Sequence, residues 1–416
     1  MNPSIKKIEL ILSFFIKKLS GMYLFQISNY IFPLVLIPIL IKKTSLDGYG
    51  EIVYITALIQ LLGTIIDYGF TYTSPVEVTR IKNRKNKLGD YYIKITILKI
   101  IIYLILMAAL CFLKQTLNLN NTTILTISII LLGNVFFPIW LFQGLSLFNQ
   151  VSAIQIITKV VFFVILISSI YLLDLQNKIY IIFLMSGNLI ISFLLSIKYI
   201  SKLIIIRKIT LSLIKESIHD LKVASNVFIS VLGSIGYNGL IPIILGKYLG
   251  SSSLAIYSIL QKMTIACQSM ILPVSQFMLT NISLDINSQW GFKKKISQSI
   301  KLHLVLSITG AICYILLGQF VSNMLGHKVE LNLIILSSII PIFSSVNNVL
   351  GIQTMIPLKK TSILRVINLS SGVIIALISV YIIKEMGIPG GVLLNLLGEV
   401  LVFFLLVYWH ARNSYD

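Results

Sequence analysis

Pro138-Ile139-Trp140-Leu141-Phe142-Gln143-Gly144 closes an apolar run that begins near Thr122 and contains no charged residue. The run is long enough to cross a bilayer, which takes about 20 apolar residues. Proline removes a helix hydrogen bond, and tryptophan favours the membrane–water boundary. Pro341 stands in a similar apolar run 203 positions later. We therefore interpret the chain as two copies of one membrane unit, each arranged around a broken helix.

The composition places the whole chain in a membrane. Of its 416 residues, 56% are hydrophobic and 12% are charged, whereas a soluble domain carries roughly 25% charged residues. A net charge of +20 would suggest nucleic acid in a soluble protein, but here most of the lysines and arginines mark topology. Residues 1–19 have too short an apolar core for a signal peptide and predict an interfacial amphipathic helix.

The apolar runs predict an all-α polytopic membrane protein with twelve transmembrane helices, because a lipid-exposed backbone must satisfy its own hydrogen bonds. The loops carry 23 lysines and arginines on one side and 7 on the other, and 4 lie within spans. The basic side is the cytoplasmic one, so both termini are expected in the cytoplasm. The predicted spans are 20–41, 49–73, 90–113, 122–145, 151–173, 178–200, 220–246, 253–281, 299–323, 330–352, 361–383 and 388–410.

The two halves of the chain look related. Prolines recur at nearly one offset, with Pro38 matching Pro242 and Pro138 matching Pro341. Six spans in each half let both halves begin on the same side, which predicts a parallel pseudo-twofold repeat about an axis along the membrane normal. The predicted domains are the interfacial helix 1–19, an N-terminal bundle 20–200, a cytoplasmic linker 201–219, a C-terminal bundle 220–410 and a cytoplasmic tail 411–416.

Charged residues inside the spans are the first functional candidates, since a charge at mid-bilayer costs about 2.5–3.5 kcal/mol. Lys94 lies near a span end and can reach the headgroups. Lys262 and Glu399 lie at similar depth, as either a structural ion pair or charges facing a cavity. The six in-span charges are Lys94, Lys99, Lys159, Lys262, Asp67 and Glu399.

Polar uncharged residues add a stripe along the second span, with Thr56, Gln60, Thr64, Asp67 and Thr71 at helical spacing. This face is expected to meet another helix or a water-filled cavity. Gly69, two residues after Asp67, marks a place where another backbone could approach closely. Further amides in the spans include Asn134, Gln143, Asn238 and Asn368.

Motifs for catalysis and metal binding are missing from the sequence. It has no Walker-A loop, no His-Glu-x-x-His motif and no Gly-x-Ser-x-Gly elbow. The three cysteines lie in apolar runs and the four histidines lack ligand spacing, so we expect no metal site and no cofactor.

Several stretches together resemble the bacterial O-antigen flippases, in the polysaccharide-transporter branch of the multidrug/oligosaccharidyl-lipid/polysaccharide (MOP) flippase superfamily. The resemblance covers nearly the whole chain and is most specific in Trp140-Leu141-Phe142-Gln143-Gly144. The other matching stretches are Asp67-Tyr68-Gly69-Phe70 with Arg80, Leu245-Gly246-Lys247-Tyr248-Leu249-Gly250 with Tyr257, and Gly387-Ile388-Pro389-Gly390-Gly391 with Glu399.

The resemblance implies two six-helix bundles around a central cavity, alternating access and no enzymatic activity. The cargo would be an undecaprenyl-pyrophosphate-linked oligosaccharide, moved from the cytoplasmic to the periplasmic leaflet of the bacterial inner membrane. Lys99, Lys159 and Lys262 would bind the pyrophosphate as point charges. Asp67 or Glu399 would serve coupling or structure, and the in-span amides Asn134, Gln143, Asn238 and Asn368 would face the sugars.

The implied partners are the lipid-linked substrate, membrane lipid, an O-antigen polymerase and a chain-length regulator, without nucleic acid. Two alternatives stay open. A cation-coupled multidrug exporter of the same fold would favour a net acidic cavity, whereas four cations and two anions lie in the spans. An O-antigen polymerase or membrane glycosyltransferase would show a large external loop, and the outer loops here are short.

Overall fold

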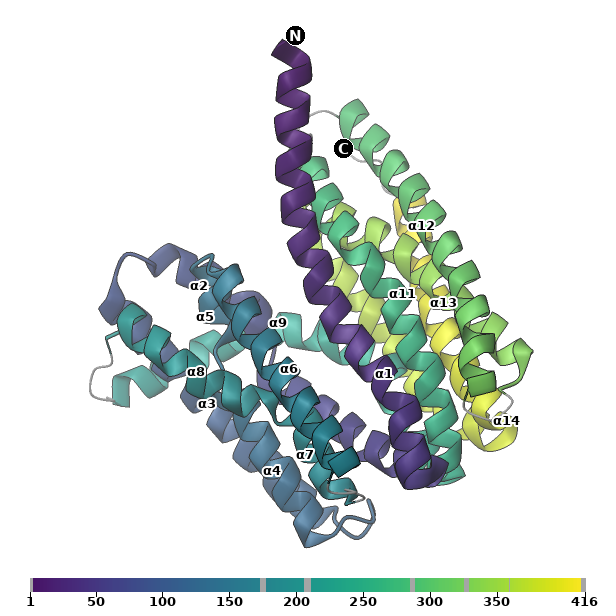
Figure 1. The fold of residues 1–416 in the computed structure, drawn as a ribbon. Coiled ribbons are helices and arrows are strands. Elements are labelled where there is room, and N and C mark those ends of the chain that lie inside the picture. Colours follow the sequence, from purple (N-terminus) through teal and green to yellow (C-terminus); the bar gives the residue numbers. More distant parts are fainter. Residues whose placement is uncertain are drawn as a thin grey trace. The chain divides into compact units, whose positions relative to one another are not determined.

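The computed structural model describes residues 3–172, 177–205, 211–284, 289–324, 329–358 and 360–412, in which every regular element is a helix (Figure 1). Nine helical segments of this described part are long and apolar enough to cross a membrane. The predicted all-α polytopic membrane protein is thereby confirmed, whereas the count of twelve spans and the pseudo-twofold repeat remain predictions.

The helices follow the predicted apolar runs, with several runs divided into two helices. They are α1 (Pro3–Asp67), α2 (Phe70–Ile81), α3 (Lys85–Phe112), α4 (Asn121–Phe136), α5 (Ile139–Gly144), α6 (Phe148–Leu172), α7 (Lys178–Ser186), α8 (Asn188–Leu203), α9 (Leu211–Asn238), α10 (Leu240–Leu249), α11 (Ser251–Leu284), α12 (Gln289–Met324), α13 (Leu331–Asn347), the π-helix η1 (Asn348–Gln353) and α14 (Thr361–Arg412).

Two long helices each extend over two predicted spans, although α1 ends before the second of its spans is complete. Helix α1 has a non-helical residue at Ser45, between the predicted spans 20–41 and 49–73. Helix α14 has one at Gly387, directly before the predicted span 388–410. These residues have φ angles of 70° and 66°, outside the right-handed helical region. Each helix is therefore kinked at this residue and continues after it.

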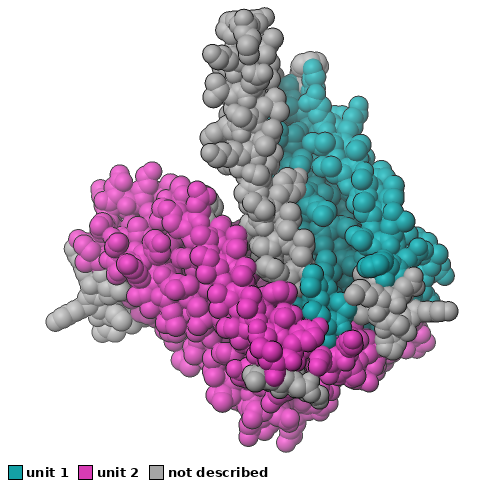
Figure 2. Space-filling view, viewed as in Figure 1, with its two compact units in different colours: residues 1–40, 256–367, 392–416 teal, residues 41–255, 368–391 magenta. Residues whose placement is uncertain are grey.

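The described chain divides into two compact units, coloured separately in Figure 2. Unit 1 comprises residues 1–40, 256–367 and 392–416, and unit 2 comprises residues 41–255 and 368–391. Each unit has its own buried apolar clusters. The predicted bundle boundaries at 20–200 and 220–410 remain predictions.

The predicted helix break at Pro138 is present in unit 2. Helix α4 ends at Phe136 and α5 begins at Ile139, with Pro138 at φ −92° and ψ 67° between them. Trp140 is 2% exposed and lies in the buried core of the unit. Its ring meets Tyr91 edge-on at a centroid distance of 5.6 Å, so α5 is anchored to α3 by aromatic packing.

The corresponding break at Pro341 is absent, which corrects the sequence interpretation. Helix α13 continues through Pro341 to Asn347. The irregularity comes after it, where Asn348–Gln353 form a π-helix. Proline in a membrane helix is tolerated when neighbouring groups accommodate the lost hydrogen bond, and α12 packs closely along α13 in unit 1 (Figure 1).

Small residues set a very close helix contact between α9 and α14 in unit 2. A Cβ atom on Gly372 of α14 would lie 2.0 Å from the backbone oxygen of Gly233 on α9, and one on Gly236 would lie 2.4 Å from that of Gly372. Such crossings allow backbones to approach directly and are typical of membrane helix pairs. The segment of α14 in unit 2 is therefore held by glycine contacts to α9.

Loops that the sequence places on one side come together in unit 2. Lys178 forms an ion pair with Glu51 at 2.7 Å, and Ser252 donates a hydrogen bond to Asp47. At the other end, the backbone N–H of Ile205 donates to the carbonyl of Lys85 at 3.2 Å. These contacts join predicted outer loops with each other and predicted cytoplasmic loops with each other.

Some predictions fall wholly or partly outside the described residues. These predictions concern the side chains of the predicted interfacial helix 1–19, residues 206–210 of the linker 201–219 and residues 413–416 of the tail 411–416. In the described part, α1 continues from Pro3 through the end of the predicted interfacial helix without a break, and α9 begins inside the predicted linker.

Candidate functional site

The junction between α1 and α2 in unit 2 contains a largely buried ion pair. Helix α1 ends at Asp67, Tyr68 and Gly69 have positive φ angles of 47° and 79°, and α2 begins at Phe70. The predicted second span 49–73 is thus divided near its end. A Cβ on Gly69 would lie 3.2 Å from the backbone nitrogen of Phe228, so the predicted close approach of another backbone occurs here.

Asp67 and Lys99, predicted for different roles, form one ion pair at this junction. The Lys99 ammonium donates to Asp67 Oδ1 at 3.0 Å, and the side chains are 3% and 25% exposed. Asp67 also accepts from the Thr71 backbone N–H at 3.2 Å and from the Thr71 hydroxyl at 2.8 Å. The carboxylate therefore caps the first turn of α2 while compensating a buried cation.

The polar stripe on α1 leads towards this pair. Gln60 is exposed, and Thr56 and Thr64 are partly exposed, with both threonine hydroxyls donating to carbonyls of their own helix. Asn134 lies beside the stripe, because a Cβ on Gly63 would be 3.4 Å from the Asn134 amide. The structure thus brings Asp67, Lys99 and Asn134 to one region of unit 2 around α1.

The other predicted residues of unit 2 lie on separate helices. Lys159 is partly buried on α6, at the edge of the buried face that carries Gln155 and Thr158. Gln143 is partly buried on α5, and Asn238 is exposed at the end of α9. Asn368 is partly buried on α14, and its carbonyl oxygen would lie 2.4 Å from a Cβ on Gly233.

Glu399 lies in unit 1, where its side chain is held by an amide. Asn347 Nδ2 donates to a Glu399 carboxylate oxygen and to the Glu399 backbone oxygen, each at 2.8 Å. Asn395, one turn earlier on the same face as predicted, donates to the Tyr257 hydroxyl at 3.4 Å. Glu399 is 6% exposed. The partner shown for this carboxylate is therefore Asn347, and Lys262 lies partly buried on α11.

A buried histidine network in unit 1 was not predicted from the sequence. His303 Nδ1 lies 2.8 Å from the Ser299 carbonyl oxygen, which can only accept, so this nitrogen carries the hydrogen. His303 Nε2 then accepts from the Ser275 hydroxyl at 2.8 Å and from Gln353 Nε2 at 3.1 Å. Gln353 also donates to Asn348 Oδ1 at 3.0 Å. The network joins α11, α12 and η1.

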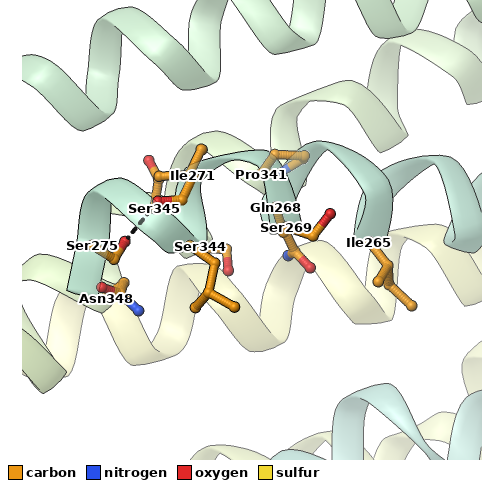
Figure 3. A pocket seen from close by; sticks show the side chains of 10 residues that line it. Ile265, Gln268, Ser269, Ile271, Ser275, Pro341, Ser344, Ser345 and Asn348 are labelled. Atoms are coloured by element: carbon orange, nitrogen blue, oxygen red, sulfur yellow. Dashed lines mark hydrogen bonds between the residues drawn. The ribbon is translucent and has the colours of Figure 1, made fainter. Parts of the chain in front are cut away.

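A cavity of about 230 Å³ adjoins this network between α11 and α13 (Figure 3). Ser275 and Asn348 belong to both the cavity and the network. The four histidines are scattered along the sequence without ligand spacing, but serines and amides in the predicted spans 253–281 and 330–352 indicate a polar region there. The lining residues are Ile265, Gln268, Ser269, Ile271, Leu272, Ser275, Pro341, Ser344, Ser345 and Asn348.

Metal chemistry finds no support in the described ranges. Within them, no group of three or more histidine, cysteine, aspartate or glutamate side chains could hold a metal ion. The arrangement offers instead a paired lysine at a helix junction in unit 2 and an uncharged cavity with polar and apolar lining in unit 1.

Sequence comparison relates the chain to polysaccharide export. Residues 15–279 match the family model described as "Polysaccharide biosynthesis protein". A Shigella dysenteriae protein named "Putative O-antigen transporter" is 25% identical over 401 residues, covering 94% of this chain and 98% of that protein. A protein of the same name from Escherichia coli (strain K12) is 25% identical over 346 residues, covering 80% and 81%.

Solved structures match the fold over nearly the whole chain. An inward-facing multidrug resistance MATE family transporter of the MOP superfamily superposes with a TM-score of 0.68 at 13% identity, covering 91% of this chain and 93% of that one. Lipid II flippase MurJ in an inward closed conformation superposes with a TM-score of 0.68 at 15% identity, covering 94% and 88%. At these identities the likeness concerns the fold alone.

Proposed function

Because the chain belongs to the polysaccharide biosynthesis protein family, we propose that it flips undecaprenyl-pyrophosphate-linked O-antigen repeat units from the cytoplasmic to the periplasmic leaflet by alternating access. The predicted place in the MOP superfamily, and among transporters rather than enzymes, is confirmed by the family match, the named relatives and the fold. The chain is a multi-pass bacterial membrane protein. The cytoplasmic location of both termini is part of what we propose.

The observation that carries the proposal is the similarity to two proteins named as O-antigen transporters over most of their length. The charges agree in sign with an anionic cargo, because lysines outnumber carboxylates in the predicted spans. A multidrug exporter for cationic compounds would need the opposite balance.

The physical task of such a flippase is to hide a charged, sugar-bearing headgroup from hydrocarbon while the polyprenyl tail stays in lipid. Burying pyrophosphate without a cationic partner would be very costly. We assign Lys99, Lys159 and Lys262 to the pyrophosphate, each acting as a point charge. The Lys99 ammonium is already paired with Asp67 at 3.0 Å, so pyrophosphate would have to compete with this carboxylate.

That competition suggests how transport could be coupled. Any ion that neutralises Asp67 would free the Lys99 ammonium for an incoming phosphate, so Asp67 is the favoured coupling residue and Glu399 the second. Transport into vesicles that stays unchanged when proton and sodium gradients are collapsed would remove this part of the proposal. The amides Asn134, Gln143, Asn238 and Asn368 are proposed to contact sugars, and an O-antigen polymerase and chain-length regulator are proposed partners.

Deletion of the gene in its source bacterium tests the function. The strain should lose surface polysaccharide and accumulate complete lipid-linked repeat units on the cytoplasmic leaflet. Incomplete units would instead identify a glycosyltransferase, and complete but unpolymerised units on the periplasmic leaflet would identify a polymerase. Normal surface polysaccharide combined with altered drug sensitivity would favour a multidrug exporter.

Lysine variants test the site within the same strain. Lys159→Ala and Lys262→Ala should abolish surface polysaccharide while the protein still inserts at wild-type levels, measured by membrane immunoblotting. Lys94, which lies near a predicted span end, supplies the matched control as Lys94→Ala. Wild-type surface polysaccharide in both test variants would contradict the lysine assignments without contradicting the flippase itself.

A further inference from the structure

We propose that the cavity between α11 and α13 of unit 1 binds one neutral sugar unit of the lipid-linked saccharide. This inference rests on the proposed function, since it assigns part of the same cargo to unit 1. It concerns residues outside the predicted sugar contacts, chiefly Gln268, Ser269 and Asn348 (Figure 3).

The cavity has the size of a single sugar ring. Its volume of about 230 Å³ is below the roughly 300–1,000 Å³ of sites that enclose drug-sized ligands. It equals the volume of roughly seven or eight water molecules in the liquid. This volume is on the order of one sugar ring, and because the pocket is partly open the rest of a repeat unit would lie outside it.

The lining is uncharged and mixes polar groups with apolar surface, which favours sugar over pyrophosphate. Six of the ten lining residues carry a hydroxyl or amide, and none is acidic or basic. Ile265, Ile271, Leu272 and Pro341 supply apolar surface for the C–H faces of a ring. A doubly charged phosphate group would lose its hydration here without finding a cation, whereas sugar hydroxyls could exchange their water partners for the lining hydroxyls and amides.

The polar groups are available to a ligand because they do not bond to one another across the cavity. Ser269 donates to the Ala266 carbonyl at 2.7 Å, and Ser345 donates to the Ile342 carbonyl at 2.8 Å, each within its own helix. Their oxygens keep lone pairs for an incoming hydroxyl. The Gln268 amide has no hydrogen bond to the described part of the chain, so it offers both a donor and an acceptor.

Between α11 and α13 themselves the lining therefore forms no polar seam, and Ser275 and Asn348 are instead bonded to His303 and Gln353. Serines and amides that hold membrane helices together donate from one helix to the other. Among the ten lining residues, all of them described, no hydrogen bond joins the α11 side to the α13 side. The cavity separates the α11 residues from the α13 residues instead.

The π-helix and the histidine network hold one wall of the cavity in place. A π-helix brings residues five positions apart into register, and Gln353 Nε2 donates to Asn348 Oδ1 at 3.0 Å. This bond uses the amide oxygen of Asn348 and leaves its Nδ2 as a donor for the cavity. His303 holds Gln353 from the other side at 3.1 Å. His303 and Gln353 are therefore positioning residues.

Binding to the purified full-length protein in nanodiscs tests the inference. One probe is the lipid-linked saccharide extracted from the deletion strain, and the other is undecaprenyl pyrophosphate without sugar. The wild type should bind the saccharide-bearing lipid more tightly. Gln268→Leu should reduce that preference about tenfold, as expected for the loss of one or two net hydrogen bonds, and leave binding of the sugar-free lipid unchanged.

Matched variants separate this outcome from damage to the fold. Gln319→Leu, at an exposed position on α12, should behave as the wild type. Gln268→Asn keeps the amide and should restore most of the preference. Equal weakening of both lipids by Gln268→Leu, or an unchanged preference, would overturn the sugar site. A deletion strain that accumulates no lipid-linked saccharide would overturn the proposed function first, and the sugar site with it.

Discussion

The buried ion pair between Lys99 and Asp67 yields the sharpest quantitative prediction. Removing one partner of a buried pair costs about 3–5 kcal/mol, because the other charge remains without compensation. The Lys99 side chain is only 3% exposed, whereas Asp67 is 25% exposed and is also bonded to Thr71. The two single substitutions should therefore destabilise the fold unequally.

Asp67→Asn leaves the Lys99 ammonium buried beside a neutral amide. Partial exposure of the site reduces the full penalty, and we expect about 2–4 kcal/mol. Lys99→Met leaves a carboxylate that keeps both Thr71 hydrogen bonds and contact with water, and it should cost about 1 kcal/mol. The double variant has no charge left at the junction. It should be more stable than Asp67→Asn alone.

Thermal unfolding of the purified variants in detergent is the assay, with midpoints compared at one heating rate. We expect Asp67→Asn to melt lowest, Lys99→Met close to the wild type and the double variant between them. If the double variant melts at the sum of the two single shifts, the side chains are not coupled and the ion-pair argument is wrong. Polysaccharide export should stay lost in the double variant if Lys99 binds pyrophosphate.

Three further predictions concern backbone contacts and an exposed ion pair. Gly372→Ala should strongly reduce the yield of folded protein in size-exclusion chromatography, because its Cβ would lie 2.0 Å from a backbone oxygen. The control Gly310→Ala should match the wild type, because the nearest neighbour of its Cβ is at 4.0 Å. Gly69→Ala should lower the melting temperature more than Gly387→Ala, because both glycines have positive φ but only Gly69 also contacts another backbone. Equal shifts would show that this backbone contact is unimportant. Lys178→Met breaks an ion pair whose side chains are 38% and 49% exposed, so it should change the free energy of unfolding by at most about 1 kcal/mol. A large drop in melting temperature would contradict this prediction.

Short stretches of sequence correctly predicted the structural features that depend on residues close together in the chain. The apolar runs identified the helices, Pro138 marked a true break, and Gly69 marked a true close approach. The shared face of Asn395 and Glu399 also followed from helical spacing, and both are buried. Each of these features depends on residues within a few turns of one another.

Pro341 shows where such reasoning is insufficient. A proline inside a predicted span suggests a break, yet α13 continues to Asn347 and the irregular turn is the π-helix from Asn348 to Gln353. Whether a helix tolerates proline depends on what packs around it, and here α12 lies against α13. Trp140 is a similar case, because its burial depends on α3 and on the other helices of unit 2.

Hydropathy accumulates residue by residue, so the amino-acid order alone is enough to predict that this chain enters the membrane as helices and which charges those helices carry. Which groups meet follows from the packing of the helices against one another. Lys99 binds Asp67 from another helix, Asn347 binds Glu399, and His303 joins three helical elements beside a cavity. Pairing between helices depends on the rotation and depth of each one, and these are set by packing across the whole unit.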